Sequence, residues 1–96
     1  MVPVWRNSAD KHKVPRADQA RVLLYPNYTA VLADEKPSRG RIVLFIGNPH
    51  GQTEREVEIL VHEFPETGEQ AVIFHVMELG PKYRRYREEH PNGSEG

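Results

Sequence analysis

The pattern of hydrophobic and polar positions predicts a helical beginning, an extended middle and a helical end. Residues 5–13 contain a weak, short helical candidate that Pro15 ends, because a residue before proline is pushed out of the α region. Residues 82–90 predict a short basic helix that begins after a proline. Residues 15–25 predict a further helix, whose apolar stripe comprises Ala17, Ala20, Leu23 and Leu24.

The segments between these helices have the composition of strands, and they comprise residues 28–34, 41–47, 54–64 and 70–79. Apolar residues occupy both odd and even positions within residues 41–47, as expected for a central strand that is buried on both faces. Residues 54–64 alternate, with Val57, Ile59 and Val61 on one side. Short turns join successive strands, which favours an antiparallel meander.

This order of elements predicts an α+β fold. We expect two short N-terminal helices, a four-stranded antiparallel sheet and a short C-terminal helix, with the helices on one face. The 96 residues fit one domain, at residues 1–90, followed by a flexible tail at 91–96.

Composition narrows the function classes. The absence of cysteine excludes disulfides, zinc ribbons and thiol nucleophiles. No apolar run is long enough to span a membrane and no signal peptide pattern opens the chain, so we expect a cytoplasmic protein without membrane contact. Both ends are basic and the middle is acidic. That pattern suits a polyanion or an acidic partner, or it reflects glutamates on a solvated face.

The five histidines are too dispersed for a helical metal motif. His62 and His75 lie on successive strands and could bind a metal together with Glu58, or they could be histidines satisfied by hydrogen bonds. His75 lies within an apolar strand, with Ile73 and Met77 at the same parity, just before the basic helix. A histidine that faces a basic cleft can act as a general acid or base.

Basic and aromatic residues alternate in the predicted C-terminal helix. Its basic residues Lys82, Arg84, Arg85 and Arg87 are suited to phosphates, and its tyrosines, Tyr83 and Tyr86, to stacking on bases. Alternatively, the helix is solvated and a tyrosine pins it to the sheet. Residues 11–13 form a second basic cluster. The sequence contains no phosphate loop, nucleophile elbow or dinucleotide fingerprint.

Three segments of the chain resemble BrnT-type toxins and their actinobacterial relatives. Trp5 and residues 8–14 resemble the family's "W…A…KHG(V/I)" opening. Residues 41–47, which end in Ile-Gly, are similar to its second strand, and residues 72–83 resemble its "viiHAMpaRpKf" ending. The resemblance covers most of residues 5–88.

This resemblance implies a RelE/ParE-like fold and a type II toxin that cleaves RNA, without metal or cofactor, and inhibits growth. It implies a cognate antitoxin as partner and a homodimer or toxin–antitoxin hetero-oligomer. The family's recurring positions imply His75 and His12 for proton transfer, Lys82 and Lys11 for charge stabilisation, with Lys11 also contacting RNA, and Tyr83 for orienting a base. The basic residues of the helix itself add RNA-binding candidates: Arg84, Arg85 and Arg87.

The sequence departs from the family pattern at two positions. Lys13 stands where the family has glycine, and Gly80 stands where it has an arginine before Pro-Lys. The loss of that arginine favours an alternative, a catalytically silent RelE/BrnT-like interaction module. A metal-dependent hydrolase built on His62, His75 and Glu58 is a third hypothesis.

Overall fold

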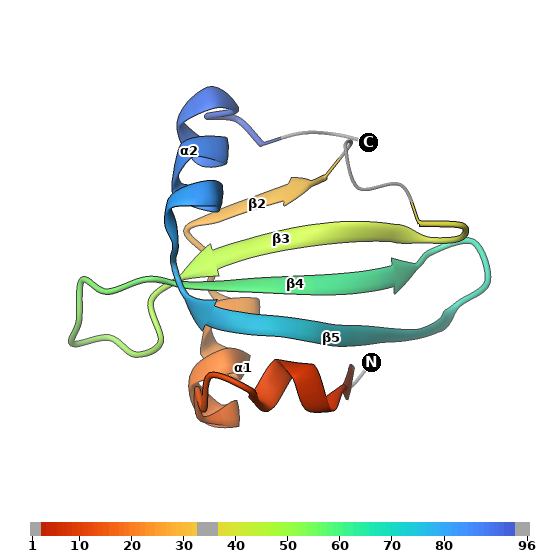
Figure 1. Cartoon of the computed structure of the whole chain (residues 1–96), viewed down its shortest axis with the longest axis horizontal. Helices are drawn as coiled ribbons and strands as arrows, with labels where there is room; N and C mark the ends of the chain where they lie inside the picture. Colours follow the sequence, from red (N-terminus) through yellow and green to blue (C-terminus); the bar gives the residue numbers. More distant parts are fainter. Residues whose placement is uncertain (1–2, 33–36, 94–96) are drawn as a thin grey trace.

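The computed structural model describes residues 3–32 and 37–93. Within these ranges the chain forms a five-stranded mixed sheet and two α-helices (Figure 1). The helices are α1 (Arg16–Leu24) and α2 (Pro81–Glu89), and a 3-10 turn, η1 (Asn7–Asp10), precedes α1. The spatial order of the strands is β1 (Val4–Trp5), β5 (Glu69–Glu78), β4 (Val57–Phe64), β3 (Arg41–Gly47) and β2 (Tyr28–Val31).

The α+β class is confirmed, and so is the antiparallel meander from β2 to β5. The prediction for residues 5–13 is confirmed only in part, because they form a short 3-10 helix, η1, in place of an α-helix, and Trp5 belongs to an added strand. Strand β1 pairs in parallel with β5, and Val4 lies opposite Val72. A strand of two residues is too short to show an alternation of apolar and polar positions. Its partner strand also lies far away in the sequence, so the local pattern could not predict the pairing of β1 with β5.

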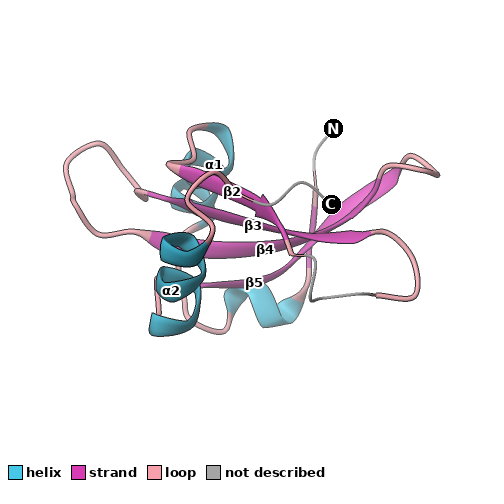
Figure 2. Ribbon diagram, turned by 90° about the horizontal axis from the view of Figure 1, so that it is seen from above, coloured by secondary structure: helices cyan, strands magenta, loops and turns pink. Residues whose placement is uncertain are grey.

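The helices cover both faces of the sheet, not one as predicted. Figure 2 shows α1 on one side and α2 on the other. The physical reason lies in the central strands. Strand β3 buries Ile42, Val43 and Leu44 in succession, so both of its faces need apolar cover.

Each face therefore has its own core. On the α2 face, buried side chains from β2, β3 and β4 pack with those of the C-terminal segment: Tyr28, Ala30, Leu32, Ile42, Leu44, Ile46, Leu60, Leu79 and Tyr83. On the α1 face, the buried cluster comprises Ala9, Val22, Val57, Ile59, Val61, Ile73 and Val76. The predicted alternation of β4 is confirmed by this division, with Val57, Ile59 and Val61 on the α1 face.

The predicted apolar stripe of α1 is confirmed only in part, because Leu23 packs against the α1-face cluster but Ala17 is exposed. The helix buries Gln19 and Val22, whereas Leu24 is 71% exposed. Gln19 can be buried because both ends of its amide are bound. Its Oε1 accepts a hydrogen bond from Trp5 Nε1 at 2.6 Å, and its Nε2 donates to Val14 O at 2.8 Å.

The remaining boundaries are close to those predicted. Strand β4 begins at Val57 rather than at residue 54, and the predicted C-terminal helix is α2. Parts of the predicted strand at 28–34 and of the tail at 91–96 lie outside the described residues. Neither described helix has the length and apolar composition that crossing a bilayer requires.

Candidate functional site

A β-bulge in β5 turns two consecutive side chains toward the same face. Leu60 pairs with His75, but the next residue of β4, Val61, pairs with Ile73, which leaves Phe74 as an extra residue in β5. Ile73 and Val76 belong to the α1-face cluster, whereas Phe74 packs against the α2-face cluster. The predicted parity of His75 with Ile73 is therefore wrong, and Phe74 is its neighbour on the α2 face.

Glu58 of β4 holds His75. His75 Nε2 lies 2.7 Å from Glu58 Oε2, and the Gly80 N–H donates to Glu58 Oε1 at 2.8 Å. Glu58 is only 3% exposed, whereas the His75 side chain is 29% exposed. An ionised carboxylate only accepts hydrogen bonds, so when Glu58 is ionised the hydrogen bond places a proton on Nε2, and Nδ1 is the nitrogen of a neutral ring that can accept one.

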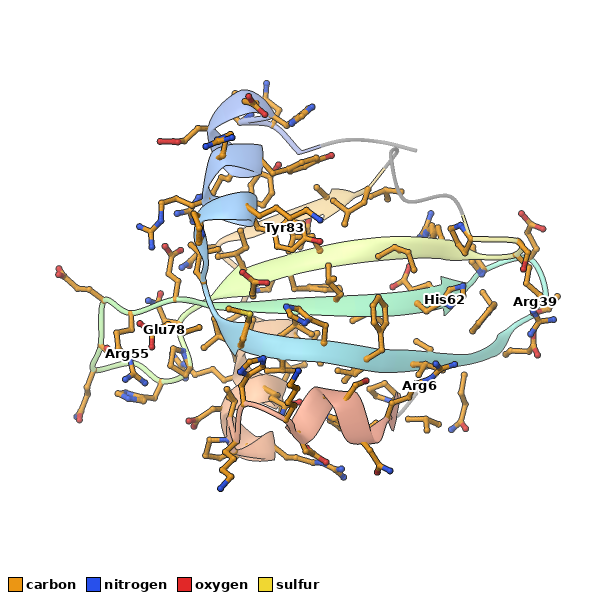
Figure 3. The ribbon with its side chains drawn as sticks, in the orientation of Figure 1. Arg6, Arg39, Arg55, His62, Glu78 and Tyr83 are labelled. Atoms are coloured by element: carbon orange, nitrogen blue, oxygen red, sulfur yellow. The ribbon has the colours of Figure 1, made fainter. Side chains whose placement is uncertain are left out.

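His75 and Glu58 line a groove of about 680 Å³ on the α2 face. Its other lining residues come from β3, β4, β5, the start of α2 and the segments just before β3 and α2: Pro37, Ile42, Leu60, Phe74, Met77, Gly80, Pro81, Lys82 and Tyr83. Tyr83 extends from α2 over the sheet (Figure 3) and is only 6% exposed. Its ring therefore has mainly a packing role and offers little surface to a base.

The loop after η1 brings His12 to His75, and their ring centroids lie 6.3 Å apart. Two hydrogen bonds anchor this loop. Ser8 Oγ donates to the carbonyl of Phe74 at 2.6 Å, and the carbonyl of Val14 accepts from Gln19. His12 lines a second hollow that shares Met77 with the groove.

Lys13 adopts a φ of 56°, in the left-handed region that favours glycine. This is the position at which the resembled family carries glycine. The turn is further fixed by a hydrogen bond of 3.0 Å from Lys13 N to the carbonyl of Asp10.

The basic residues of α2 divide into two groups. Lys82 lines the groove and Arg85 is exposed beside it, in a hollow that both residues line. Arg84 is exposed and directs Nη2 to the carbonyl of Leu79 at 3.4 Å. Arg87 is half-buried and binds Glu56 through both of its terminal nitrogens, at 2.7 and 2.9 Å. Lys11, at the end of η1, is exposed and lies next to His12 in the sequence.

The hydrogen bonds from Arg87 lower the pKa of Glu56, and a further hydrogen bond from Asn27 acts in the same direction. The same pair raises the pKa of Arg87. Burial raises the pKa of Tyr28, whose hydroxyl donates to the carbonyl of His90 at 2.6 Å. These contacts fasten α2 to the sheet, so Arg87 has a structural role.

The three-residue metal site does not form. His62 pairs with Val72 in the sheet, and its Nε2 lies 2.7 Å from the carbonyl of Arg39. Figure 3 shows His62 and Arg39 together at the hairpin end of the sheet, away from Tyr83. Across residues 3–32 and 37–93, no three His, Asp or Glu side chains gather as a ligand set.

Sequence reasoning grouped Glu58 with His75 only as ligands of a metal site with His62, and missed the hydrogen bond between them. Counting the register back from the turn between β4 and β5 would have put them near each other. It also missed Phe74, because a bulge leaves no mark in the apolar pattern of β5.

The site thus combines a carboxylate-bound imidazole and a lysine that line one groove with a second imidazole, His12, in the neighbouring hollow. Such a set can transfer protons and stabilise negative charge without a metal. No protein-family model, curated protein or solved structure matches this chain.

Proposed function

We propose that this chain is a metal-independent endoribonuclease of the RelE/ParE type, acting in the cytoplasm as the toxin of a toxin–antitoxin pair. The observation that carries the proposal is the geometry of His75, which is bound to Glu58 at 2.7 Å and lies beside His12 and a groove. The resemblance to BrnT-type toxins supports it, and the left-handed turn at Lys13 agrees with that resemblance.

In this mechanism, His75 Nδ1 takes the proton of a ribose 2′-hydroxyl. The 2′-oxygen bonds to the adjacent phosphorus, and the bond from phosphorus to the 5′-oxygen breaks. His12, in its protonated form, donates a proton to that leaving oxygen. Lys82 stabilises the charge that develops on the phosphoryl oxygens. The products are a 2′,3′-cyclic phosphate and a 5′-hydroxyl.

The test is cleavage of single-stranded RNA by the purified protein in EDTA, compared between His75→Ala and His62→Ala. The two histidines lie on the same hairpin, but only His75 lines the groove. We expect His75→Ala to lose about 10²–10⁴-fold in rate, and His62→Ala to retain it. Expression in cells should arrest growth with the wild type and not with His75→Ala. Equal cleavage by both variants, or cleavage that EDTA abolishes, would contradict the proposal.

A second candidate function is a catalytically silent interaction module of the same fold. The ion pair of Arg87 with Glu56 and the burial of Tyr83 favour it, because both residues serve the interior rather than a ligand. Intact RNA after long incubation, together with tight binding to an antitoxin-like protein encoded beside it, would distinguish this function from the first.

A further inference from the structure

The groove on the α2 face has a polar end and an apolar end. Glu58, Gly80 and Lys82 lie at the end where α2 begins. Two residues further along β4 lies Leu60, which together with Ile42 and Phe74 lines the apolar part. His75, opposite Leu60, stands at the junction of the two parts. A ligand with an apolar portion joined to an anionic group can contact the apolar part of the groove and Lys82 together.

The bulge places the Phe74 side chain in the same groove as His75, the proposed proton-transfer group. In a regular strand, consecutive side chains point to opposite faces, so the neighbour of His75 would face α1. The extra residue places both side chains along the same groove. The Phe74 carbonyl, which the bulge exposes, accepts the Ser8 hydroxyl at 2.6 Å, so the conformation is held in place.

We propose that Phe74 forms a nucleobase subsite beside the scissile phosphate, and that the substrate is therefore single-stranded RNA. This inference rests on the proposed function. A base can stack on a side chain only when it is free of its own pairing partner and neighbours, which a duplex does not allow. The half-buried ring of Phe74 and the apolar residues around it receive the base, while Lys82 meets the phosphate.

The surface next to the groove has the charge that a continuing strand needs. A further hollow shares Pro81 and Lys82 with the groove and is also lined by Arg85, Tyr86 and Glu89. The path from Phe74 past His75 and Lys82 to Arg85 thus runs from an apolar pocket to a basic helix. An apolar peptide side chain would fit the first part, but it would not account for the basic continuation.

The experiment measures binding of a fluorescently labelled, 2′-O-methylated RNA hexamer, which cannot be cleaved, as a single strand and as a duplex. Phe74→Leu keeps an apolar side chain in the core but removes the ring. Phe45→Leu is the matched control, because Phe45 lies in the hollow on the α1 face. We expect Phe74→Leu to weaken single-strand binding roughly tenfold, with duplex binding unchanged. A hexamer that lacks its bases should bind both proteins equally.

Equal binding by the wild type and Phe74→Leu would overturn the subsite, as would equal weakening by Phe45→Leu. No binding of the hexamer by the wild type would also overturn it and direct attention to a peptide occupant. Since the probe cannot be cleaved, the subsite and the proposed function can fail separately. If binding depends on Phe74 but RNA is not cleaved, only the proposed ribonuclease activity is contradicted. If cleavage depends on His75 but Phe74→Leu has no effect on binding, only the subsite is contradicted.

Discussion

The α1 face and the α2 face of this sheet each bury one polar side chain among the described residues, and the two differ in kind. On the α1 face, the neutral amide of Gln19 is bound to Trp5 and Val14, which are themselves parts of the framework. On the α2 face, the carboxylate of Glu58 is bound to a partly exposed imidazole at a groove. A buried charge is costly unless it is well bound, so its position beside a groove makes Glu58 a candidate for function as well as for packing.

Substitutions at Ile59 and Glu58, which are neighbours in β4, can separate a role in packing from a role in the candidate site. Ile59 is fully buried on the α1 face, one residue after Glu58. We expect Ile59→Ala to lower the free energy of unfolding by about 2–5 kcal/mol, because it leaves a cavity in a packed core. Urea denaturation measures the loss, and Ile59→Val should lose about 0.5–1.5 kcal/mol. Equal stability of all three proteins would contradict the assignment of this face to packing.

Glu58→Gln should have the opposite effect to Ile59→Ala: it should lower activity and change stability little. We expect kcat to fall about 10- to 100-fold, which corresponds to about 1.4–2.7 kcal/mol, because His75 loses the acceptor that fixes its proton on Nε2. KM should stay constant, and the urea midpoint should change little, because the amide oxygen can still accept the Gly80 N–H. Glu56→Gln is the control, since Glu56 binds Arg87 instead. An unchanged kcat in Glu58→Gln would remove the positioning role.

The ion pair between Glu56 and Arg87 should make the attachment of α2 dependent on pH. The pKa of Glu56 is lowered in the folded protein from its ordinary value of 4.5. The pair therefore stabilises the fold above that value, and its contribution is lost as the pH falls through the lowered pKa. Glu56→Gln should be about 1 kcal/mol less stable than the wild type at pH 7, and this difference should disappear in acid. A difference that persists in acid would contradict the ionic contribution.

The smallest expected effect concerns the turn after His12. Lys13→Gly should stabilise the protein by about 0.5–1 kcal/mol, since glycine adopts a positive φ without strain. Lys11→Gly is the matched control: Lys11 has a right-handed helical φ of −56°, so the same change should destabilise. Thermal unfolding of the two variants measures the difference. A loss of stability in both would show that the turn is not strained.

Some of this architecture could be predicted from the sequence, and some could not. The alternation of β4 was sufficient to assign its two faces, because each face packs against its own core. The alternation of β5 was misleading at Phe74, because the bulge depends on pairing with β4 and on the Ser8 hydroxyl. The stripe of α1 was incomplete for a similar reason: Gln19 is buried by distant partners that no local pattern reveals.

The candidate site, like the fold, could be predicted from the sequence only in part. His75 was found from its position in an apolar strand before a basic helix, and His12 from the resemblance alone. Their proximity depends on η1 packing against β5, which is a tertiary contact. Arg87 looked like part of a uniform basic helix, but its bond to Glu56 depends on how α2 crosses the sheet, which charge patterning does not contain.

The contact between Ser8 and Phe74 joins residues that are 66 positions apart in the sequence. Contacts of this length form late, because a large loop must close before they can contribute. During synthesis, His12 leaves the ribosome long before β5 exists. The nascent chain therefore carries an incomplete pair of imidazoles until β5 has emerged, which delays assembly of the candidate site until then.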